Sequence, residues 1–210
     1  MRLDKLLVTK GYFTTRQKAK EAIKRGFVIV NGVRITKPSK EVDIDAKIVV
    51  VEREKPKGYW KLRELDEKWN FVKGVVLDLG SSAGGFLIYA SEKAEFVYGI
   101  EYSKEFEEEL RSIERKAKNV RVFIEDAFKF DLSKIGNVDV ILNDLTLDTE
   151  SSLKALERFL SNLKDDGFVL FIQKIGKRFE KVDFSRIGLK IIKRERSDSK
   201  KEIYYLLEKL

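Results

Sequence analysis

Apolar runs recur along most of this chain, and their spacing predicts its main structural elements. From residue 75 onward, five such runs begin about 20 to 30 residues apart, with helical patterns between them. Buried runs at this spacing are typical of βαβ units, in which a parallel sheet carries helices on both faces. Two further strands are predicted over residues 187–193 and 202–207. We therefore expect an α/β fold with a doubly wound, mostly parallel sheet of seven strands, and the five runs are VVLDL, FVYGI, VRVFI, VDVIL and GFVLFI.

Before residue 55 the pattern is different and predicts two short helices followed by short strands. Leucines at helical spacing predict a first helix that ends before Gly11. Thr14 or Thr15 can cap a second helix, in which apolar residues form one stripe, and Gly26 is a suitable stop. Five cations surround that stripe, namely Arg16, Lys18, Lys20, Lys24 and Arg25.

The rest of this first part reads as a small sheet and a linker. The segment FVIVNGVRIT contains two β-rich runs joined by Asn31-Gly32, which is typical of a two-residue type I′ hairpin. A further strand is predicted over residues 47–51, and the charged segment EREKPKG has the composition of a linker. We therefore expect a small α+β domain over residues 1–54 and the larger α/β domain over residues 55–210.

The composition excludes several classes of chemistry. The chain has no cysteine and no histidine, which excludes disulfides, thiol nucleophiles and Ser-His-Asp triads and removes the usual zinc and haem ligands, so we expect no metal site. Charged residues make up 37% and methionine occurs once, a balance frequent in ion-pair-rich proteins of thermophiles. No apolar run approaches the roughly 18 residues of a membrane span, and the first residues lack a signal-peptide pattern. We therefore expect a cytoplasmic protein that does not bind membranes.

Positive charge is concentrated in the small first domain. Residues 1–54 contain 13 Lys/Arg and 7 Asp/Glu, a net charge of +6, whereas the other 156 residues contain 30 and 28, a net charge of +2. A small basic module of this kind is typical of polyanion binding. The alternative is a lysine-rich surface that is merely solvated, and composition alone does not separate the two.

A glycine-rich segment between acidic residues follows the first strand of the larger domain. The strand ends in DLGSSAGGF (residues 78–86), a turn that leads into a helix and lets a ligand approach the backbone. Glu101 ends the second strand, where a carboxylate can bind both hydroxyls of an adenosine ribose. Asp126 follows the third strand, where it can meet an adenine amino group. The loop reads G-x-x-x-G-G rather than G-x-G-x-x-G, so a dinucleotide of the NAD type fits less well.

These residues predict an adenosine-containing cofactor at the carboxyl ends of the strands. An alternative for Gly84 and Gly85 is that they only allow a helix to pack closely, and Glu101 can equally be a solvated strand end. The predicted cofactor-binding residues are Asp78, Gly80, Ser81, Ser82, Gly84, Gly85, Phe86, Glu101 and Asp126.

The first part of the chain resembles a known RNA-binding domain. Residues 1 to about 51, through RLDKLL and TTRQKAKEAIKRGFVIVNGVRITKPSKEV, resemble the small domain first described in ribosomal small-subunit protein four. That resemblance implies binding of structured RNA by the second helix and the turn after it, through the five cations at residues 16–25. Clustered cations suit a phosphate backbone and carry no sequence information by themselves.

The larger domain resembles class I methyltransferases, which bind S-adenosylmethionine, and within them the FtsJ family of RNA ribose 2′-O-methyltransferases. The loop DLGSSAGGF carries this resemblance, and the TlyA branch joins the same basic module to this fold. The family has a Lys-Asp-Lys-Glu tetrad. The resemblance places it at Lys61 in YWKL, Asp144 after the fourth strand, Lys174 at the end of FVLFIQK and Glu202 in KEIY.

The resemblance implies a role for each member of this tetrad. Lys174 would be the base or the residue that steers the hydroxyl, Lys61 and Glu202 would position the substrate, and Asp144 would orient Lys174. A lysine accepts a proton only when it is neutral. Two ammonium groups about 4 Å apart repel by about 4 kcal/mol at a dielectric constant near 20, which favours a neutral lysine, whereas the two carboxylates oppose this. Lys177 is a rival for the position of Lys174.

Each tetrad residue also has a plain structural alternative. Lys61 can lie on a solvated helix face, Asp144 can cap the following helix, Lys174 can belong to a basic surface patch, and Glu202 can protect an exposed sheet edge. The segment LTLD after Asp144, and Ala83 in the glycine loop, depart from the family pattern. These departures bear on the wall that faces the substrate.

Together these features predict an S-adenosylmethionine-dependent RNA ribose 2′-O-methyltransferase that acts on rRNA or ribosomal subunits. One rival hypothesis is a non-catalytic RNA-binding or ribosome-assembly factor that keeps the cofactor pocket. Another is methylation of a base or a protein side chain, and the lack of an Asn-Pro-Pro-Tyr-type motif argues against its exocyclic-amine version. The oligomeric state stays open.

Overall fold

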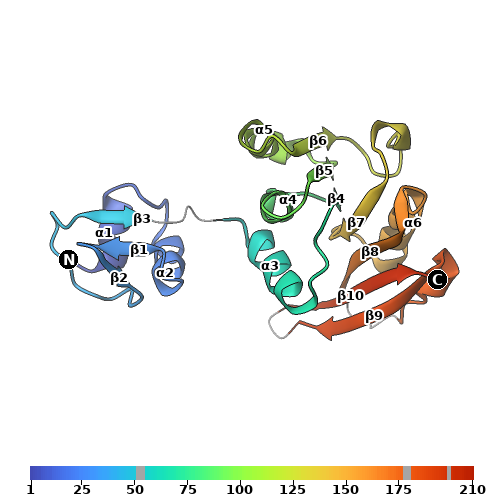
Figure 1. Cartoon of the computed structure of the whole chain (residues 1–210). Helices are drawn as coiled ribbons and strands as arrows, with labels where there is room; N and C mark the ends of the chain where they lie inside the picture. Colours follow the sequence, from blue (N-terminus) through green and yellow to red (C-terminus); the bar gives the residue numbers. More distant parts are fainter. Residues whose placement is uncertain (51–54, 177–180, 198–199) are drawn as a thin grey trace. The chain divides into compact units, whose positions relative to one another are not determined.

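The computed structural model describes residues 1–50, 55–176, 181–197 and 200–210, which form two compact units (Figure 1). The N-terminal unit comprises Met1–Lys55 and the C-terminal unit comprises Pro56–Leu210. Each unit has its own hydrophobic core and its own sheet. None of the helices in the described part of the chain is long and apolar enough to cross a membrane.

The N-terminal unit packs two helices against a three-stranded antiparallel sheet. Thr15 caps the second helix, since its side chain accepts a hydrogen bond from the backbone nitrogen of Lys18. Asn31 and Gly32 both have positive φ angles, of 50° and 80°, which confirms the predicted type I′ hairpin. The elements are α1 (Leu3–Thr9), α2 (Arg16–Lys24), β1 (Val28–Val30), β2 (Val33–Ile35) and β3 (Ile48–Val50), and the strand order is β2-β1-β3.

A buried carboxylate ties the two helices of this unit together. Asp4 of α1 is fully buried and pairs with Arg2 at 3.1 Å and with Arg16 of α2 at 2.8 Å. The hydrogen bond from Arg2, opposed by burial and supported by Arg16, lowers the pKa of Asp4 to about 2. Arg16, which the sequence assigns to RNA binding, is therefore also part of the framework of the fold.

The C-terminal unit is built on a seven-stranded sheet with the order β6-β5-β4-β7-β8-β10-β9 (Figure 1). The first five strands in this order are parallel, and β10 is antiparallel to both of its neighbours. This confirms the predicted doubly wound, mostly parallel architecture. The strands are β4 (Val75–Leu79), β5 (Phe96–Glu101), β6 (Val120–Ile124), β7 (Val138–Asn143), β8 (Leu163–Lys174), β9 (Leu189–Arg196) and β10 (Glu202–Lys209).

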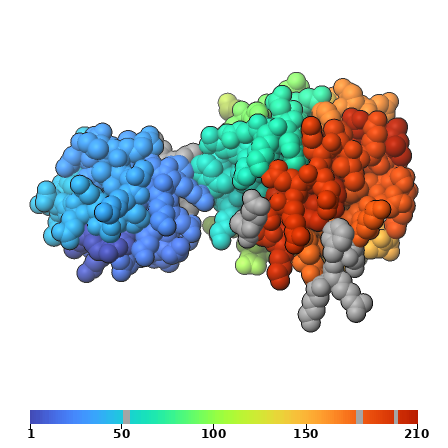
Figure 2. Space-filling view, turned by 90° about the horizontal axis from the view of Figure 1, so that it is seen from below, coloured from blue at the N-terminus to red at the C-terminus, as the bar shows by residue number. Residues whose placement is uncertain are grey.

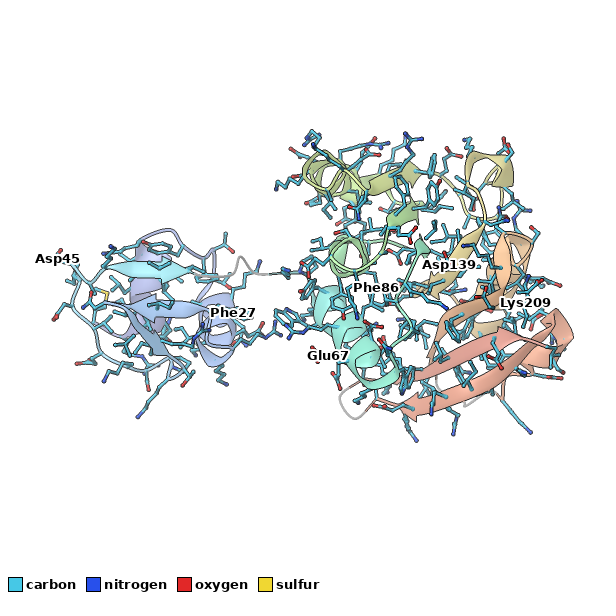
Figure 3. The ribbon with its side chains drawn as sticks, viewed as in Figure 1. Phe27, Asp45, Glu67, Phe86, Asp139 and Lys209 are labelled. Carbon is cyan, nitrogen blue, oxygen red and sulfur yellow. The ribbon has the colours of Figure 1, made fainter. Side chains whose placement is uncertain are left out.

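Helices cover both faces of this sheet. Apolar residues of α3 (Lys57–Trp69), α4 (Gly85–Ser91) and α5 (Glu107–Lys116) share one core cluster, and those of α6 (Thr149–Phe159) share the other. Phe86 of α4 is buried in the first cluster and lies beside α3 (Figure 3). Three short 3₁₀ turns, η1 (Lys104–Phe106), η2 (Leu132–Lys134) and η3 (Phe184–Ile187), complete the elements of the described residues.

A second buried carboxylate fixes the end of α3. Asp66 accepts hydrogen bonds from the backbone nitrogens of Phe71 and Val72, at 2.9 and 2.8 Å, and from the Tyr89 hydroxyl of α4 at 2.9 Å. It also pairs with Lys93. Because charged hydrogen bonds of this kind are strong, α3 is held in one position against α4 and the start of the sheet. This fixes the backbone from which Lys61 extends.

Candidate active site

A cavity of about 590 Å³ opens at the carboxyl ends of β4, β5, β6 and β7. This is the end at which doubly wound sheets bind their ligands. Of the nine residues predicted to bind a cofactor, the structure places four in the lining, namely Gly80, Ser82, Glu101 and Asp126. Asp144 and Lys174 line the same cavity, so two predicted catalytic residues face the predicted cofactor site.

Glu101 organises the cavity wall. Its two carboxylate oxygens accept hydrogen bonds from the backbone nitrogens of Ser82 and Ser103, each at 2.7 Å. The first bond holds the glycine loop, in which Gly80 and Ser82 have φ angles of 85° and 48°. Glu101 is 8% exposed, so it is not a solvated strand end. Each carboxylate oxygen has a further lone pair with which it can accept a ligand hydroxyl.

Gly84 and Gly85 allow α4 to pack closely against its neighbouring helices. A Cβ on Gly84 would lie 2.1 Å from Ile113 of α5, and one on Gly85 would lie 2.6 Å from the backbone nitrogen of Tyr59 in α3. These two glycines let α4 approach its neighbouring helices, and neither lines the cavity. The structure thus supports the alternative interpretation, close helix packing, for both. Phe86 likewise belongs to the core.

Asp78 is the most unusual carboxyl in the unit. Asp78 is completely buried, and neither of its two carboxylate oxygens accepts a hydrogen bond from the described residues. Burial, together with the nearby charges of Asp144 and Glu101, raises the pKa of Asp78 to about 8. Neither Asp78 nor Ser81 lines the cavity, so the structure does not bring these two predicted residues to its surface.

Aromatic side chains complete the cavity near Asp126, and sequence reasoning missed them. Tyr102, Phe106 and Phe128 all contribute to the lining, and Tyr102 is 77% exposed. Asp126 accepts the backbone N–H of Phe128 with one oxygen, at 2.9 Å, and its second oxygen accepts none from the described residues. The sequence signal that could have found Tyr102 is its place directly after the strand that ends at Glu101, at the edge where doubly wound sheets bind their ligands.

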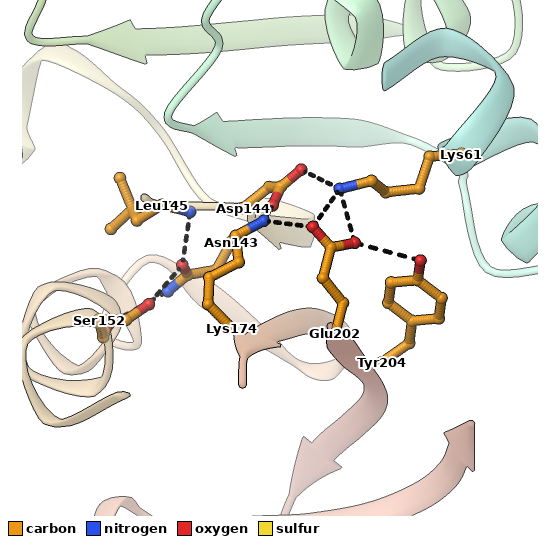
Figure 4. A network of polar contacts seen from close by, with 8 residues as sticks. All are labelled: Lys61, Asn143, Asp144, Leu145, Ser152, Lys174, Glu202 and Tyr204. Atoms are coloured by element: carbon orange, nitrogen blue, oxygen red, sulfur yellow. Dashed lines mark hydrogen bonds and ion pairs between the residues drawn. The ribbon is translucent and has the colours of Figure 1, made fainter. Parts of the chain in front are cut away.

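The four predicted catalytic side chains meet in one network (Figure 4). Nζ of Lys61 lies 2.7 Å from Oδ2 of Asp144 and 3.2 Å from Oε2 of Glu202. Nζ of Lys174 lies 2.8 Å from Oε1 of Glu202 and also pairs with Oδ1 of Asp144. Cations and carboxylates therefore alternate around a ring, with no net charge. Tyr204, which the sequence did not indicate, donates its hydroxyl to Glu202 at 3.2 Å.

This alternation decides the charge of Lys174. Burial alone would lower its pKa, but the charges and hydrogen bonds of Asp144 and Glu202 outweigh burial and raise it above its ordinary value. Burial alone would raise the pKa of Glu202, but Lys61 and Lys174 outweigh burial and lower it. The predicted repulsion between the two ammonium groups is thus overcome by the carboxylates between them, which favour the protonated form of Lys174.

The structural alternatives for Lys61, Asp144 and Glu202 do not describe the geometry of the network. The Lys61 side chain is 10% exposed and Glu202 is buried, so neither lies on a solvated surface. The cap of α6 is Asp148, whose side chain accepts the backbone N–H of Ser151, and not Asp144. Lys177, the rival for the third position, lies outside the described residues.

A buried amide holds the segment after Asp144. Asn143 is completely buried, donates to the backbone oxygen of Ser152 at 3.2 Å and accepts the Ser152 hydroxyl at 3.0 Å (Figure 4). Its side-chain oxygen also accepts the backbone N–H of Leu145. The segment that departs from the family pattern therefore leaves β7 in a defined direction, and Leu145, Thr146 and Leu147 line the cavity.

In the N-terminal unit, the five predicted RNA-binding cations lie in two groups on α2 and at its C-cap, outside the buried stripe. Residues four apart lie on the same side of a helix, so Arg16, Lys20 and Lys24 follow one side of α2. Lys18 and Arg25 follow another, and the buried stripe lies between the two groups. Within the first group, Arg16 also pairs with the buried Asp4, whereas Lys20 and Lys24 form no such ion pair with the described residues.

Comparison with known proteins assigns both units. The S4 domain matches residues 1–48, and the FtsJ-like methyltransferase family matches residues 55–183. YqxC of Bacillus subtilis, provisionally named as an rRNA methyltransferase, is 31% identical over 157 residues, which are 70% of this chain and 56% of that protein. The chain spans about half the length of the first curated relatives it matches.

Solved structures share the fold. A Streptococcus thermophilus protein provisionally named as a hemolysin covers 100% of this chain and 88% of its own, with a TM-score of 0.58 and 22% identity. Fibrillarin of Aeropyrum pernix, solved with natively bound S-adenosyl-L-methionine, covers 65% of this chain and 67% of its own, with a TM-score of 0.56 and 19% identity. Because the family match at residues 55–183 takes in more than half of the sequence, the chain belongs to the FtsJ-like methyltransferase family, with an S4 domain before its methyltransferase unit.

Proposed function

We propose that this protein is an S-adenosylmethionine-dependent RNA ribose 2′-O-methyltransferase that acts on ribosomal RNA. The observation that carries the proposal is that Asp144 and Lys174 belong both to the charged tetrad and to the lining of the cavity. A methyl donor in the cavity and a hydroxyl at the tetrad would therefore be neighbours. Membership of a methyltransferase family and the rRNA methyltransferase name of the Bacillus relative support the choice of reaction and substrate class.

The cavity residues fit an adenosine cofactor that carries a positive charge. Glu101 can accept ribose hydroxyls, the second oxygen of Asp126 can accept an adenine amino group, and Tyr102 offers an aromatic surface. Asp78 adds a buried carboxyl without a partner close behind the glycine loop. When bound, S-adenosylmethionine supplies an electrophilic methyl group.

The tetrad would handle the substrate hydroxyl. Asp144 and Glu202 favour the protonated form of Lys174, so its first role is to hold the hydroxyl oxygen by donating a hydrogen bond. The fraction of Lys174 that has lost its proton to solvent can accept the hydroxyl proton as the new oxygen–carbon bond forms and the bond from that carbon to sulfur breaks. Asp144 orients Lys174 through their ion pair, and Lys61 and Glu202 keep both groups in place. Much of the acceleration would come from this alignment, which contributes about 7 to 11 kcal/mol in favourable cases.

Transfer to mapped RNA is the direct test. Purified protein is incubated with methyl-labelled S-adenosylmethionine and, in separate reactions, intact ribosomes, separated subunits and naked rRNA. We expect a labelled ribose that blocks alkaline cleavage at one site, and no label with Lys174→Ala. Label on a base or on a ribosomal protein would refute the 2′-O assignment. Cofactor binding without transfer to any of these substrates would favour the non-catalytic assembly factor.

The S4 domain would dock the RNA through α2. Log affinity for single-stranded RNA falls with log salt at a slope of about −0.7 per phosphate contact. We expect Lys20→Ala/Lys24→Ala to weaken RNA binding and to flatten this slope. Lys37→Ala/Lys40→Ala, which removes the same charge from exposed loop positions in the same unit, is the matched control. Equal slopes for the two variants would mean that α2 does not contact the RNA.

A further inference from the structure

The carboxyl end of the large sheet is divided into three zones along the strand order. The cavity lies over β4 to β7, and the tetrad follows at the ends of β7 and β8 and at the start of β10. The next zone is the end of β9 and the turn from β9 to β10, because β9 pairs with β10 at the edge of the sheet. A substrate at the tetrad therefore has the cofactor cavity on one side and this turn on the other.

This third zone carries a group of exposed cations, which we call the basic edge and define as Arg194, Arg196, Lys200 and Lys201. Residues 189–201 contain six Lys/Arg and two Asp/Glu, a net charge of +4. Arg194 lies 5.8 Å over the ring of Tyr205, and no member of the basic edge forms an ion pair with the described residues. Figure 2 shows β9, in orange-red, at the surface of the C-terminal unit.

The backbone holds the basic edge close to the tetrad. The backbone nitrogen of Ile175, next to Lys174, donates to the backbone oxygen of Lys201 at 2.8 Å. Ser197 donates its backbone N–H to the oxygen of Glu202 at 3.0 Å, and its side chain accepts the backbone N–H of Lys200 at 3.2 Å. The backbone at Ser197 and Lys201 is thus hydrogen-bonded to Glu202 of the tetrad and to Ile175, the neighbour of Lys174.

Electrostatics connects the two zones as well. The tetrad has two cations and two anions, so it does not neutralise the charge of the basic edge. Partial burial and the ammonium group of Lys61 lower the pKa of Lys200, and the carboxylates of Glu202 and Asp144 oppose them. The ammonium of Lys200 is therefore close enough to respond to the tetrad and lacks an anion of its own among the described residues.

We propose that the basic edge binds the phosphates of the RNA strand on one flank of the target ribose. This inference rests on the proposed function, since it takes the ribose to be at the tetrad. A ribose held there has a phosphate on each side, and a flank that runs away from the cofactor cavity along the strand order would lie over the basic edge. Exposed Lys and Arg side chains without partners are suited to phosphate oxygens.

The test compares two triple variants of the full chain that remove the same charges. Arg196→Ala/Lys200→Ala/Lys201→Ala alters the basic edge. Arg115→Ala/Lys116→Ala/Lys118→Ala is the matched control, because these exposed cations lie just before β6, at the opposite end of the strands, and form no ion pairs with the described residues.

The probe is a fluorescein-labelled single-stranded RNA of mixed sequence, titrated by anisotropy over a range of salt. We expect the edge variant to bind more weakly and to lose about 0.7 from the salt slope for each contact removed, so about 2 in total. The control variant should stay close to the wild type. Thermal unfolding and S-adenosylhomocysteine binding, both expected to be unchanged, show that the edge variant is folded. Lys200→Arg keeps the positive charge and should therefore keep the wild-type salt slope.

Three outcomes would overturn the inference. The first is an equal loss of RNA affinity in both triple variants, which would indicate a nonspecific effect of charge. The second is no loss of RNA affinity in either variant. The third is that the edge variant keeps its RNA affinity but loses binding to phosphatidylserine vesicles, measured in parallel. Failure of the proposed function is a separate result, namely that the wild type transfers no methyl group to any ribose. The RNA-binding comparison does not depend on that transfer.

Discussion

Replacing Gly85 with alanine separates helix packing from cofactor binding. The added methyl carbon would lie 2.6 Å from the backbone nitrogen of Tyr59, and 2.8 and 2.9 Å from two backbone carbons of Gly58. Ordinary contact distances are near 3.5 to 4.0 Å, so α3 and α4 must separate by about 1 Å. Backbone atoms cannot rotate away as a side chain can. The strain therefore falls on the α3–α4 interface.

The size of the effect follows from this clash. Overpacking of a tight core typically costs about 1 to 3 kcal/mol, and we expect Gly85→Ala to lower the free energy of unfolding by this amount. For a unit of this size that corresponds to a fall in Tm of about 2 to 4 °C per kcal/mol. The same displacement would move Lys61, half a turn further along α3, relative to Asp144, which lies 2.7 Å from its Nζ. Methyl transfer should therefore fall more than cofactor affinity.

Gly136 provides the matched control. A Cβ at that position would meet no atom within 4 Å, so Gly136→Ala should leave stability and transfer near the wild-type values. Urea unfolding, calorimetric titration with S-adenosylhomocysteine and methyl transfer are measured for both variants. If Gly85→Ala loses cofactor affinity while its stability is unchanged, the packing explanation is wrong and the glycine serves the ligand.

Three further perturbations test the charges. Glu202→Gln removes one of the carboxylates that raise the pKa of Lys174, so the pH at which methyl transfer rises should move downward, and an unchanged pH–rate profile would exclude Lys174 as the proton acceptor. Glu101→Gln should weaken S-adenosylhomocysteine binding by about tenfold or more in calorimetry, since a hydrogen bond to a charged group is worth about 1.5 to 3 kcal/mol, and full affinity would contradict the assigned ribose contact. The lowered pKa of Asp4, about 2, gives the N-terminal unit stability that is present above the ordinary value of 3.8 and lost as the pH falls towards 2. Leucine methyl signals of α1 in NMR should show this acid transition, and Asp4→Asn should remove it.

Local patterns predicted those features whose causes are local. The type I′ turn needs only two adjacent residues with positive φ, and Asn31-Gly32 supplies them. The doubly wound sheet follows from the spacing of apolar runs, and the carboxyl ends of parallel strands then bring Glu101, Asp126 and Asp144 to one edge. The tetrad came from a family resemblance, since nothing in the spacing of four residues over 142 positions of chain indicates contact.

Features that depend on distant partners were missed. The role of Asp66 depends on Tyr89 and Lys93, and no local pattern marks a carboxylate that will be buried under another helix. Gly84 and Gly85 look like part of a ligand loop because the sequence does not show how closely α4 approaches α3 and α5. The strand β8 begins at Leu163 rather than at Gly167, because the buried Leu163 pairs with Val138 of β7 ahead of a register shift that leaves residues 164–167 without a strand-pairing partner in β7.

The position of β10 between β8 and β9 has a consequence for biosynthesis. A chain emerging from the ribosome can form the five parallel strands in order, but β9 has no partner until β10 has been made and inserted beside it. Glu202 arrives with that strand. A nascent chain released just before it would carry the residues of the cofactor cavity, yet its two lysines would share a single carboxylate. Under the proposed mechanism, the complete tetrad therefore forms only once β10 has been made, after the S4 domain has been synthesised.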